Sequence, residues 1–226
     1  MERQPTATPT MTATLSSTYF GPVQWYQKLL RYAHVFIEHH DSYQKQTYRN
    51  RCLIATTNGI QPLTVPVSVD GHSHGVRVSD HGNWRHQHWQ ALQSAYGDSP
   101  FFEFYEDDLR PFYNERWEYL YDYNEAICQK MCELLDIHPV VSATTEYQHH
   151  PENDFRNSIQ PKIIAPDADF QPRRYYQVYE QKHGFLPNLS ILDLLFNMGP
   201  ESIFYLILQR FIHDGTLLCS GCPNKV

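Results

Sequence analysis

The alternation of apolar and polar residues predicts that the chain begins with two strands and a helix. Thr12–Tyr19 and Val35–Ile37 are short runs of β-branched and apolar residues, which favour strands. Between them, Pro22 suits the first turn of a helix, and Trp25 and Leu29 mark its apolar face. A strand, a helix and a strand within so few residues predict a parallel βαβ unit.

A β-hairpin is predicted after the polar stretch that follows. Cys52–Ala55 has the pattern of a strand, and Leu63–Val67 that of its return strand. Asn58-Gly59 lies between them, and this dipeptide is the strongest short signal for a tight hairpin turn. Pro66 has no backbone N–H, so it places the return strand at an edge or a bulge.

The remainder of the chain is mainly helical in its pattern. Apolar residues recur at helical spacing in the ranges Trp84–Tyr96, Glu115–Leu135, Ser190–Asn197 and Glu201–His213. Gln148–Arg174 is rich in Pro, Asp and Asn, which predicts a long ordered loop with one brief strand at Ile163–Ile164. We therefore expect an α/β fold: a mixed sheet with an N-terminal βαβ unit and a β-hairpin, covered by helices, with a mainly helical C-terminal half. The alternative is an α+β fold.

The chain of 226 residues is long enough for one substantial core, and no linker divides it. Residues 19–218 are expected to form a single domain. Residues 1–18 are expected to be a disordered or partly ordered N-terminal segment, because Met1–Thr10 is rich in Thr and Pro. Residues 219–226 are expected to be a C-terminal tail.

Composition narrows the class of protein. A formal net charge of -7 argues against non-specific nucleic-acid binding, which needs a basic face. Five cysteines, an odd number, make no disulfide framework. Met1–Ser17 lacks the pattern of a secretory signal, and no segment has the run of about 20 apolar residues that spans a membrane, so we expect a cytoplasmic protein. Leu192–Ile212 is apolar but interrupted by Gly199 and Pro200, so it is core or a subunit contact, and a homo-oligomer is open.

The densest group of polar residues begins where the strand at Val35–Ile37 ends. Its members are Glu38, His39, His40, Asp41, Tyr43, Lys45, Tyr48, Arg49, Asn50 and Arg51. Ligands of open α/β sheets bind beyond the carboxyl ends of the strands. Arginine forks bind oxyanions, lysine adds a point charge and tyrosine supplies donors, so the group suits a phosphorylated or carboxylated small-molecule substrate. The alternative is a solvated loop and edge strand whose charges face water.

The same region carries a family resemblance. The segments concerned, in order, are Tyr19-Phe20-Gly21-Pro22, Tyr43-Gln44-Lys45, Tyr48-Arg49-Asn50-Arg51, Asn58-Gly59, Leu63–Val67 and Gly184–Asp193. They resemble the WbqC-like family over most of the chain after Tyr19. The family usually has Pro where this chain has Gly21, and many members have acidic residues where it has His39 and His40.

The resemblance implies a biosynthetic context for the protein and no specific mechanism. Several members of the family are encoded among bacterial surface-polysaccharide genes, which suggests a transferase acting on an amino sugar or a nucleotide-linked sugar. In that reading Lys45, Arg49 and Arg51 bind the anion, and Tyr43 and Asn50 orient the substrate. Tyr48 is also counted among the substrate-binding residues. His39 or His40 is the general base, and Glu38 is counted with them among the catalytic candidates. The alternative is a non-catalytic partner of a polysaccharide-assembly complex that binds through tyrosine-rich surface.

Three further clusters are interpreted as carrying no chemistry. The histidines at positions 72, 74, 81, 86 and 88 lack metal-ligand spacing, because His86 and His88 point to different sides of a helix, so no metal is predicted. Cys219 and Cys222 are interpreted as inert thiols, and the helical pair Cys128 and Cys132 as small core residues. No dinucleotide, P-loop, hydrolase or zincin motif occurs, so no cofactor is predicted.

Overall fold

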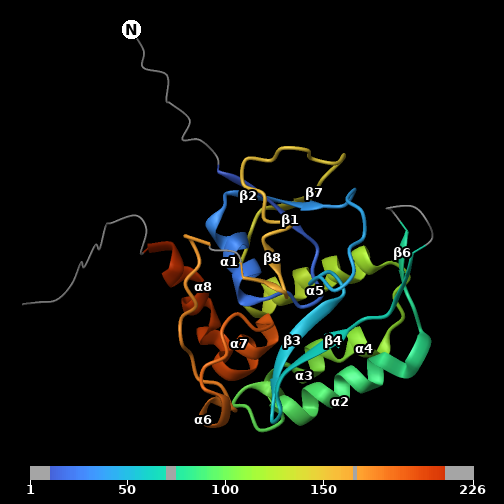
Figure 1. Cartoon of the computed structure of the whole chain (residues 1–226). Helices are drawn as coiled ribbons and strands as arrows, with labels where there is room; N and C mark the ends of the chain where they lie inside the picture. The colour runs from blue at the N-terminus through green and yellow to red at the C-terminus, as the bar shows by residue number, and fades with distance from the viewer. Residues whose placement is uncertain (1–10, 70–74, 165–166, 212–226) are drawn as a thin grey trace, which may run out of the picture.

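The computed structural model describes residues 11–69, 75–164 and 167–211. It confirms the parallel βαβ unit, made of β1 (Thr12–Ser16), α1 (Val23–Arg31) and β2 (His34–Glu38). A third strand, β7 (Val141–Ala143), joins β2 in parallel, so the sheet has the order β1-β2-β7. The three strands lie together in the upper part of Figure 1. The carboxyl ends of all three strands therefore lie at one edge of this sheet.

The predicted hairpin is confirmed, but its turn lies one residue earlier. Strand β3 (Arg51–Thr56) pairs antiparallel with β4 (Gly59–Thr64), and the two-residue loop is Thr57-Asn58. Gly59 opens β4 with φ at +100°. The expected return strand Leu63–Val67 is wrong in its bounds, because β4 ends before Pro66 and the next strand, β5 (Val67–Val69), pairs instead with β6 (Val76–Val78).

The middle of the chain is helical, as predicted. After a short 3-10 helix, η1 (His81–Asn83), the helices are α2 (Trp84–Tyr96), α3 (Phe102–Leu109), α4 (Pro111–Asn114) and α5 (Leu120–Leu134). The expected start of α5 at Glu115 is wrong. The backbone N–H of Val78 donates to the carbonyl of Glu118, and Tyr119 forms a bridge with Arg77, so this segment runs extended along β6. Tertiary pairing thus overrides local helix propensity.

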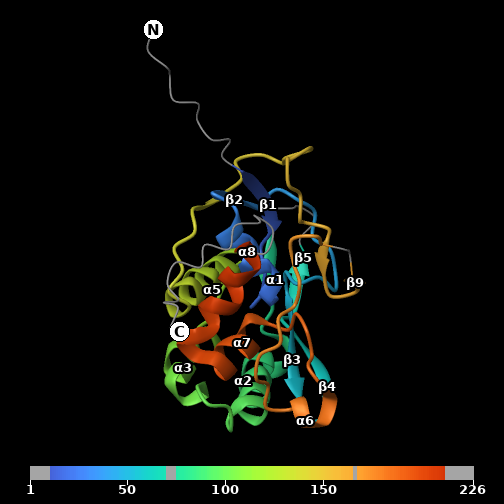
Figure 2. The same ribbon diagram turned by 90° about the vertical axis from the view of Figure 1, so that its left-hand side faces the viewer.

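The C-terminal part packs two apolar helices against the first one. Its elements are β8 (Ile159–Gln160), β9 (Ile163–Ile164), α6 (Glu180–His183), α7 (Ile191–Met198), the 3-10 helix η2 (Gly199–Glu201) and α8 (Ser202–Phe211). Both α7 and α8 contact α1, and Figure 2 shows α7 and α8 on the face that is turned toward the viewer. Burial of every residue from Ile191 to Phe196 makes α7 a central core element.

Several predictions fall outside the described residues: His72 and His74, the end of the last helix at His213, and the tail with Cys219 and Cys222. Within the ranges that the structure covers, no helix is long and apolar enough to cross a membrane. One cluster of buried side chains extends from Ala13 in β1 to Leu206 in α8, which joins the parallel sheet, the hairpin and the helices in a common core.

Candidate functional site

Two adjoining cavities lie between the parallel sheet and α5, and they meet at the carboxyl edge of the sheet; the larger one also extends along β7 to the residues that precede this strand. We call them together the α5 cleft. The larger cavity has a volume of about 580 Å³ and the smaller about 220 Å³, and Ser17 and Tyr121 line both. Ser17 follows β1, His39 follows β2 and Ala143 ends β7. The cleft is thus where ligands bind in open α/β sheets.

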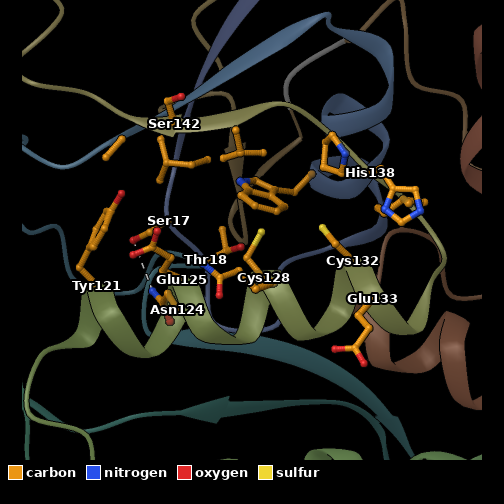
Figure 3. A pocket seen from close by; sticks show the side chains of 17 residues that line it. Ser17, Thr18, Tyr121, Asn124, Glu125, Cys128, Cys132, Glu133, His138 and Ser142 are labelled. Atoms are coloured by element: carbon orange, nitrogen blue, oxygen red, sulfur yellow. Dashed lines mark hydrogen bonds between the residues drawn. The ribbon is translucent and has the colours of Figure 1, made fainter.

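The larger cavity, here the apolar arm, is walled by the sheet and one face of α5. Figure 3 shows the sulfur atoms of Cys128 and Cys132 pointing from α5 into it. Both side chains are half-buried and pack against the hydrophobic core, as expected, and both also line this cavity, which was not expected. Their thiols interact: the hydrogen bond to Cys132 and burial raise the pKa of Cys128, while the same hydrogen bond lowers the pKa of Cys132.

The smaller cavity, here the polar arm, contains four of the nine predicted site residues. These are Glu38, His39, Tyr43 and Arg49. The ring of His39 stacks on Tyr121 of α5, with 4.0 Å between ring centroids, and its backbone N–H donates to Thr144 Oγ1 at 3.1 Å. Both contacts fix the histidine at the cavity wall.

Glu38 is held by four hydrogen bonds. Its Oε1 accepts from the backbone N–H of His40 at 2.9 Å and from Thr144 Oγ1 at 2.8 Å, while its Oε2 accepts from the Gln148 N–H at 3.2 Å and Arg156 Nη1 at 2.8 Å. Burial raises the pKa of Glu38, but these hydrogen bonds and the charge of Arg156 outweigh it and hold the pKa below its ordinary value. Glu38 is therefore an ionised carboxylate that ties the end of β2 to the 144–156 loop.

Arg49 is similarly held in place. Its guanidinium forms an ion pair with Asp41, donates to the carbonyl of Ser42 at 2.8 Å and donates to Ser16 Oγ at 3.1 Å. The side chain is 8% exposed. Asp41 therefore supplies a compensating charge, and Arg49 is positioned against the cavity before any ligand binds.

The other predicted site residues do not line the described part of the cleft. His40 Nε2 lies 3.0 Å from the carbonyl oxygen of Thr144, Asn50 Nδ2 donates to the carbonyl of Val65 at 2.8 Å, and Arg51 Nε donates to Thr64 Oγ1 at 2.9 Å. Tyr48 is buried and Lys45 is exposed.

The prediction that Arg49 and Arg51 project from one strand face is wrong, because Arg49 lies in the turn before β3. Both charges still favour ionisation of Tyr43, although burial raises its pKa, so the three side chains share one electrostatic environment.

The sequence did not reveal the wall that α5 supplies. Tyr121 and Asn124 come from this helix, more than 80 residues after Ser17 and His39. Asn124 is 1% exposed, and its Nδ2 donates to the carbonyl of Arg49 at 2.8 Å. Asn124 is a polar residue on the otherwise apolar buried face of α5, which was the available signal, since such a residue needs a specific partner.

Metal ligation has no support in the part of the chain that the structure describes, where no group of three His, Cys, Asp or Glu side chains is placed to hold an ion. His86 is exposed and His88 buried, as their spacing on α2 predicts. His88 Nδ1 lies 2.9 Å from the hydroxyl of Tyr19, so this histidine belongs to a buried polar network.

Comparison with known proteins gives one family. The model of the WbqC-like protein family matches residues 17–162 and 165–205. The chain is also similar to "Uncharacterized protein Rv1507c" of Mycobacterium tuberculosis (strain ATCC 25618 / H37Rv), with 31% identity over 225 residues, covering 86% of this chain and 96% of that protein. No solved structure matches the chain significantly.

Proposed function

The chain belongs to the WbqC-like protein family, and from that membership together with the α5 cleft we propose that it is a transferase acting on an activated sugar or amino sugar in bacterial surface-polysaccharide biosynthesis. The observation that carries the proposal is the cleft itself. A charged polar arm and a larger apolar arm meet at the carboxyl ends of parallel strands, between Ser17 and Tyr121. Such a site can hold a polar reacting group and an apolar portion of a second substrate together.

In this proposal the polar arm binds the sugar and its anionic activating group. The ion pair with Asp41 holds Arg49 in position, and its guanidinium binds the anion at the cavity wall. The exposed Lys45 adds positive charge from the neighbouring loop. Tyr43 supplies a hydroxyl to the same arm. In this proposal Arg51 stabilises the loop and does not contact the anion, because its Nε donates a hydrogen bond to Thr64 Oγ1.

The general base of the proposed reaction is His39. Its ring lines the polar arm and stacks on Tyr121, whereas His40 Nε2 is engaged with the backbone of Thr144. The base accepts the proton of the acceptor hydroxyl or amine as that atom attacks the activated carbon, and the bond to the anionic leaving group breaks. Glu38 acts as a positioning residue, because its hydrogen bonds fix the backbone on which His39 lies.

Calorimetric titration of the full chain with a panel of nucleotide sugars and sugar phosphates tests the proposal. We expect one ligand to bind saturably. His39→Asn should abolish turnover of that ligand, while its affinity for the variant stays within about threefold of the wild-type value. Lys45→Gln should weaken binding of the ligand about tenfold, because one charged contact is lost. Lys182→Gln, which removes an exposed lysine whose Nζ contacts Thr57, is the matched control and should bind normally.

Arg49→Lys and Arg51→Lys separate the substrate site from scaffolding. A site at Arg49 predicts weaker binding for its variant, because lysine cannot reproduce a guanidinium fork. If both variants melt early yet bind normally, the cluster is scaffolding. Failure of every panel member together with a co-purifying protein partner would favour the interaction-protein alternative.

A further inference from the structure

A hollow at the N-terminal end of α2 brings three arginine side chains together in a volume of about 330 Å³. Arg85 lies in the first turn of α2, Arg110 directly follows α3, and Arg116 lies in the extended segment before α5. We call this site the arginine hollow. Asp80 is the one carboxylate in its described lining, so two positive charges remain uncompensated. The whole chain, in contrast, has a formal charge of -7.

The existing contacts do not neutralise the three guanidinium groups. Asp80 Oδ1 accepts from Arg85 Nη1 at 2.5 Å, and Asp80 Oδ2 lies 3.6 Å from Arg116 Nη1. Arg110 forms no ion pair with any described residue, and its guanidinium lies over the ring of Trp89, 5.7 Å from the centroid. A single carboxylate is thus shared by two cations, and the third rests on an aromatic face.

The helix adds to the positive potential. The first turn of α2 has no acidic residue, and Asn83 at its N-cap makes no side-chain capping bond. Partial positive charge gathers at a helix N-terminus, where a cation such as Arg85 is unfavourable. In addition, Arg85 Nε and Nη2 are buried without a hydrogen-bond partner among the described residues, which adds to the free-energy cost of its charge. Negative charge in the hollow would lower that cost.

We infer that the arginine hollow binds a ligand through a phosphate or diphosphate group. Two uncompensated charges match a dianion better than a single carboxylate, and guanidinium forks bind phosphate oxygens in pairs. Arg110 and Arg116 are exposed and able to reach the ligand, while Arg85 is held beneath by Asp80. The hollow shares no lining residue with the α5 cleft, so the inference does not rest on the proposed transferase function.

Calorimetric titration of the full chain with inorganic pyrophosphate is the direct test. The wild type should bind saturably, and the double variant Arg110→Gln/Arg116→Gln should bind at least tenfold more weakly. The control Arg173→Gln/Arg174→Gln removes two exposed arginines elsewhere and should change the affinity less than threefold. An equal loss of affinity in both double variants would mean that binding depends only on the net charge of the protein, and it would overturn the inference. The inference would also fail if the wild type showed no saturable binding at pyrophosphate concentrations up to about 10 mM.

Asp80→Asn gives a test of opposite sign. Removing the competing carboxylate should strengthen pyrophosphate binding severalfold, whereas a purely structural role for the cluster would make the variant bind no better. Uridine diphosphate distinguishes the sources of the group: affinity equal to that for pyrophosphate assigns the site to the phosphates alone, and higher affinity assigns it to a nucleotide. Citrate binding tenfold more tightly than pyrophosphate would overturn the phosphate assignment.

Discussion

Mild acid should destabilise the folded protein through His88. This histidine is 6% exposed, its Nδ1 contacts the Tyr19 hydroxyl at 2.9 Å, and it also binds the backbone of Thr64. Burial lowers the pKa of His88 from its ordinary value of 6.5 to about 4, despite the hydrogen bond to Thr64. The unfolded chain therefore binds a proton on His88 between pH 6.5 and pH 4, and the folded chain does not.

The sign and size of the effect follow from linkage. Stability from a depressed histidine is fully present above the unfolded pKa and is lost as the pH falls toward the folded pKa. Between pH 7 and pH 5 the two pKa values give a loss of about 2 kcal/mol in the free energy of unfolding. Asp193 has the opposite effect on stability, because burial raises its pKa and the folded chain therefore binds its proton more readily than the unfolded chain. The pH dependence of the wild-type stability is the sum of these contributions.

Urea unfolding at pH 7, 6 and 5 with His88→Gln as the comparison isolates this histidine. The glutamine amide can both donate and accept, so the variant should fold, with lower stability at pH 7. Its stability should then fall by about 2 kcal/mol less than that of the wild type between pH 7 and pH 5, because contributions from other groups cancel in the difference. Parallel profiles for the two proteins would refute the reasoning.

Three further substitutions, together with the control Arg174→Gln, test the supports of the fold by urea unfolding at pH 7. Glu38→Gln should cost about 2 kcal/mol, because it removes the charge of a carboxylate that accepts four hydrogen bonds, although Arg156 keeps its ion pair with Asp154; a change below about 0.5 kcal/mol would contradict the network. Lys28→Met should cost about 3 kcal/mol, because the fully buried Lys28 Nζ lies 2.6 Å from Asp167. The control Arg174→Gln breaks an ion pair whose arginine is exposed and should cost less than about 1 kcal/mol. Gly59→Val should cost about 1–2 kcal/mol from its φ of +100° alone, because an added Cβ meets no atom within 4 Å; an unchanged stability would mean that the turn relaxes freely.

Local periodicity determined the elements that the sequence predicted best. The bounds of α2, Trp84–Tyr96, were predicted correctly because large apolar residues mark one face of the helix from end to end. The hairpin was found through Asn58-Gly59, although the left-handed conformation needed there belongs to the first residue of β4. The start of α5 was missed because the pairing of Glu118 and Tyr119 with β6 is a long-range contact, which periodicity does not contain.

The site followed the same division. The rule that ligands bind beyond the carboxyl ends of strands placed a ligand cleft at the end of β2, and His39 and Arg49 do line a cavity there. The rule gave no information on the wall opposite, so Tyr121 and both thiols of α5 were missed as site residues. Asp41 was already counted in the polar group from the sequence, and its ion pair with Arg49 turns a dense run of charges into a partly compensated one.

Closeness in the sequence is therefore a poor measure of uncompensated charge in this protein. Lys45, Arg49 and Arg51 stand in one short segment, yet the fold gives Arg49 a carboxylate and turns Arg51 toward Thr64. Arg85 lies in α2 and Arg110 directly after α3, and they meet Arg116 in a hollow with a single shared carboxylate. Because like charges are brought together there at a free-energy cost that Asp80 only partly offsets, an anion has more to contribute at the arginine hollow than beside Arg49. If one site dominates pyrophosphate binding, the charge balance predicts that it is the hollow.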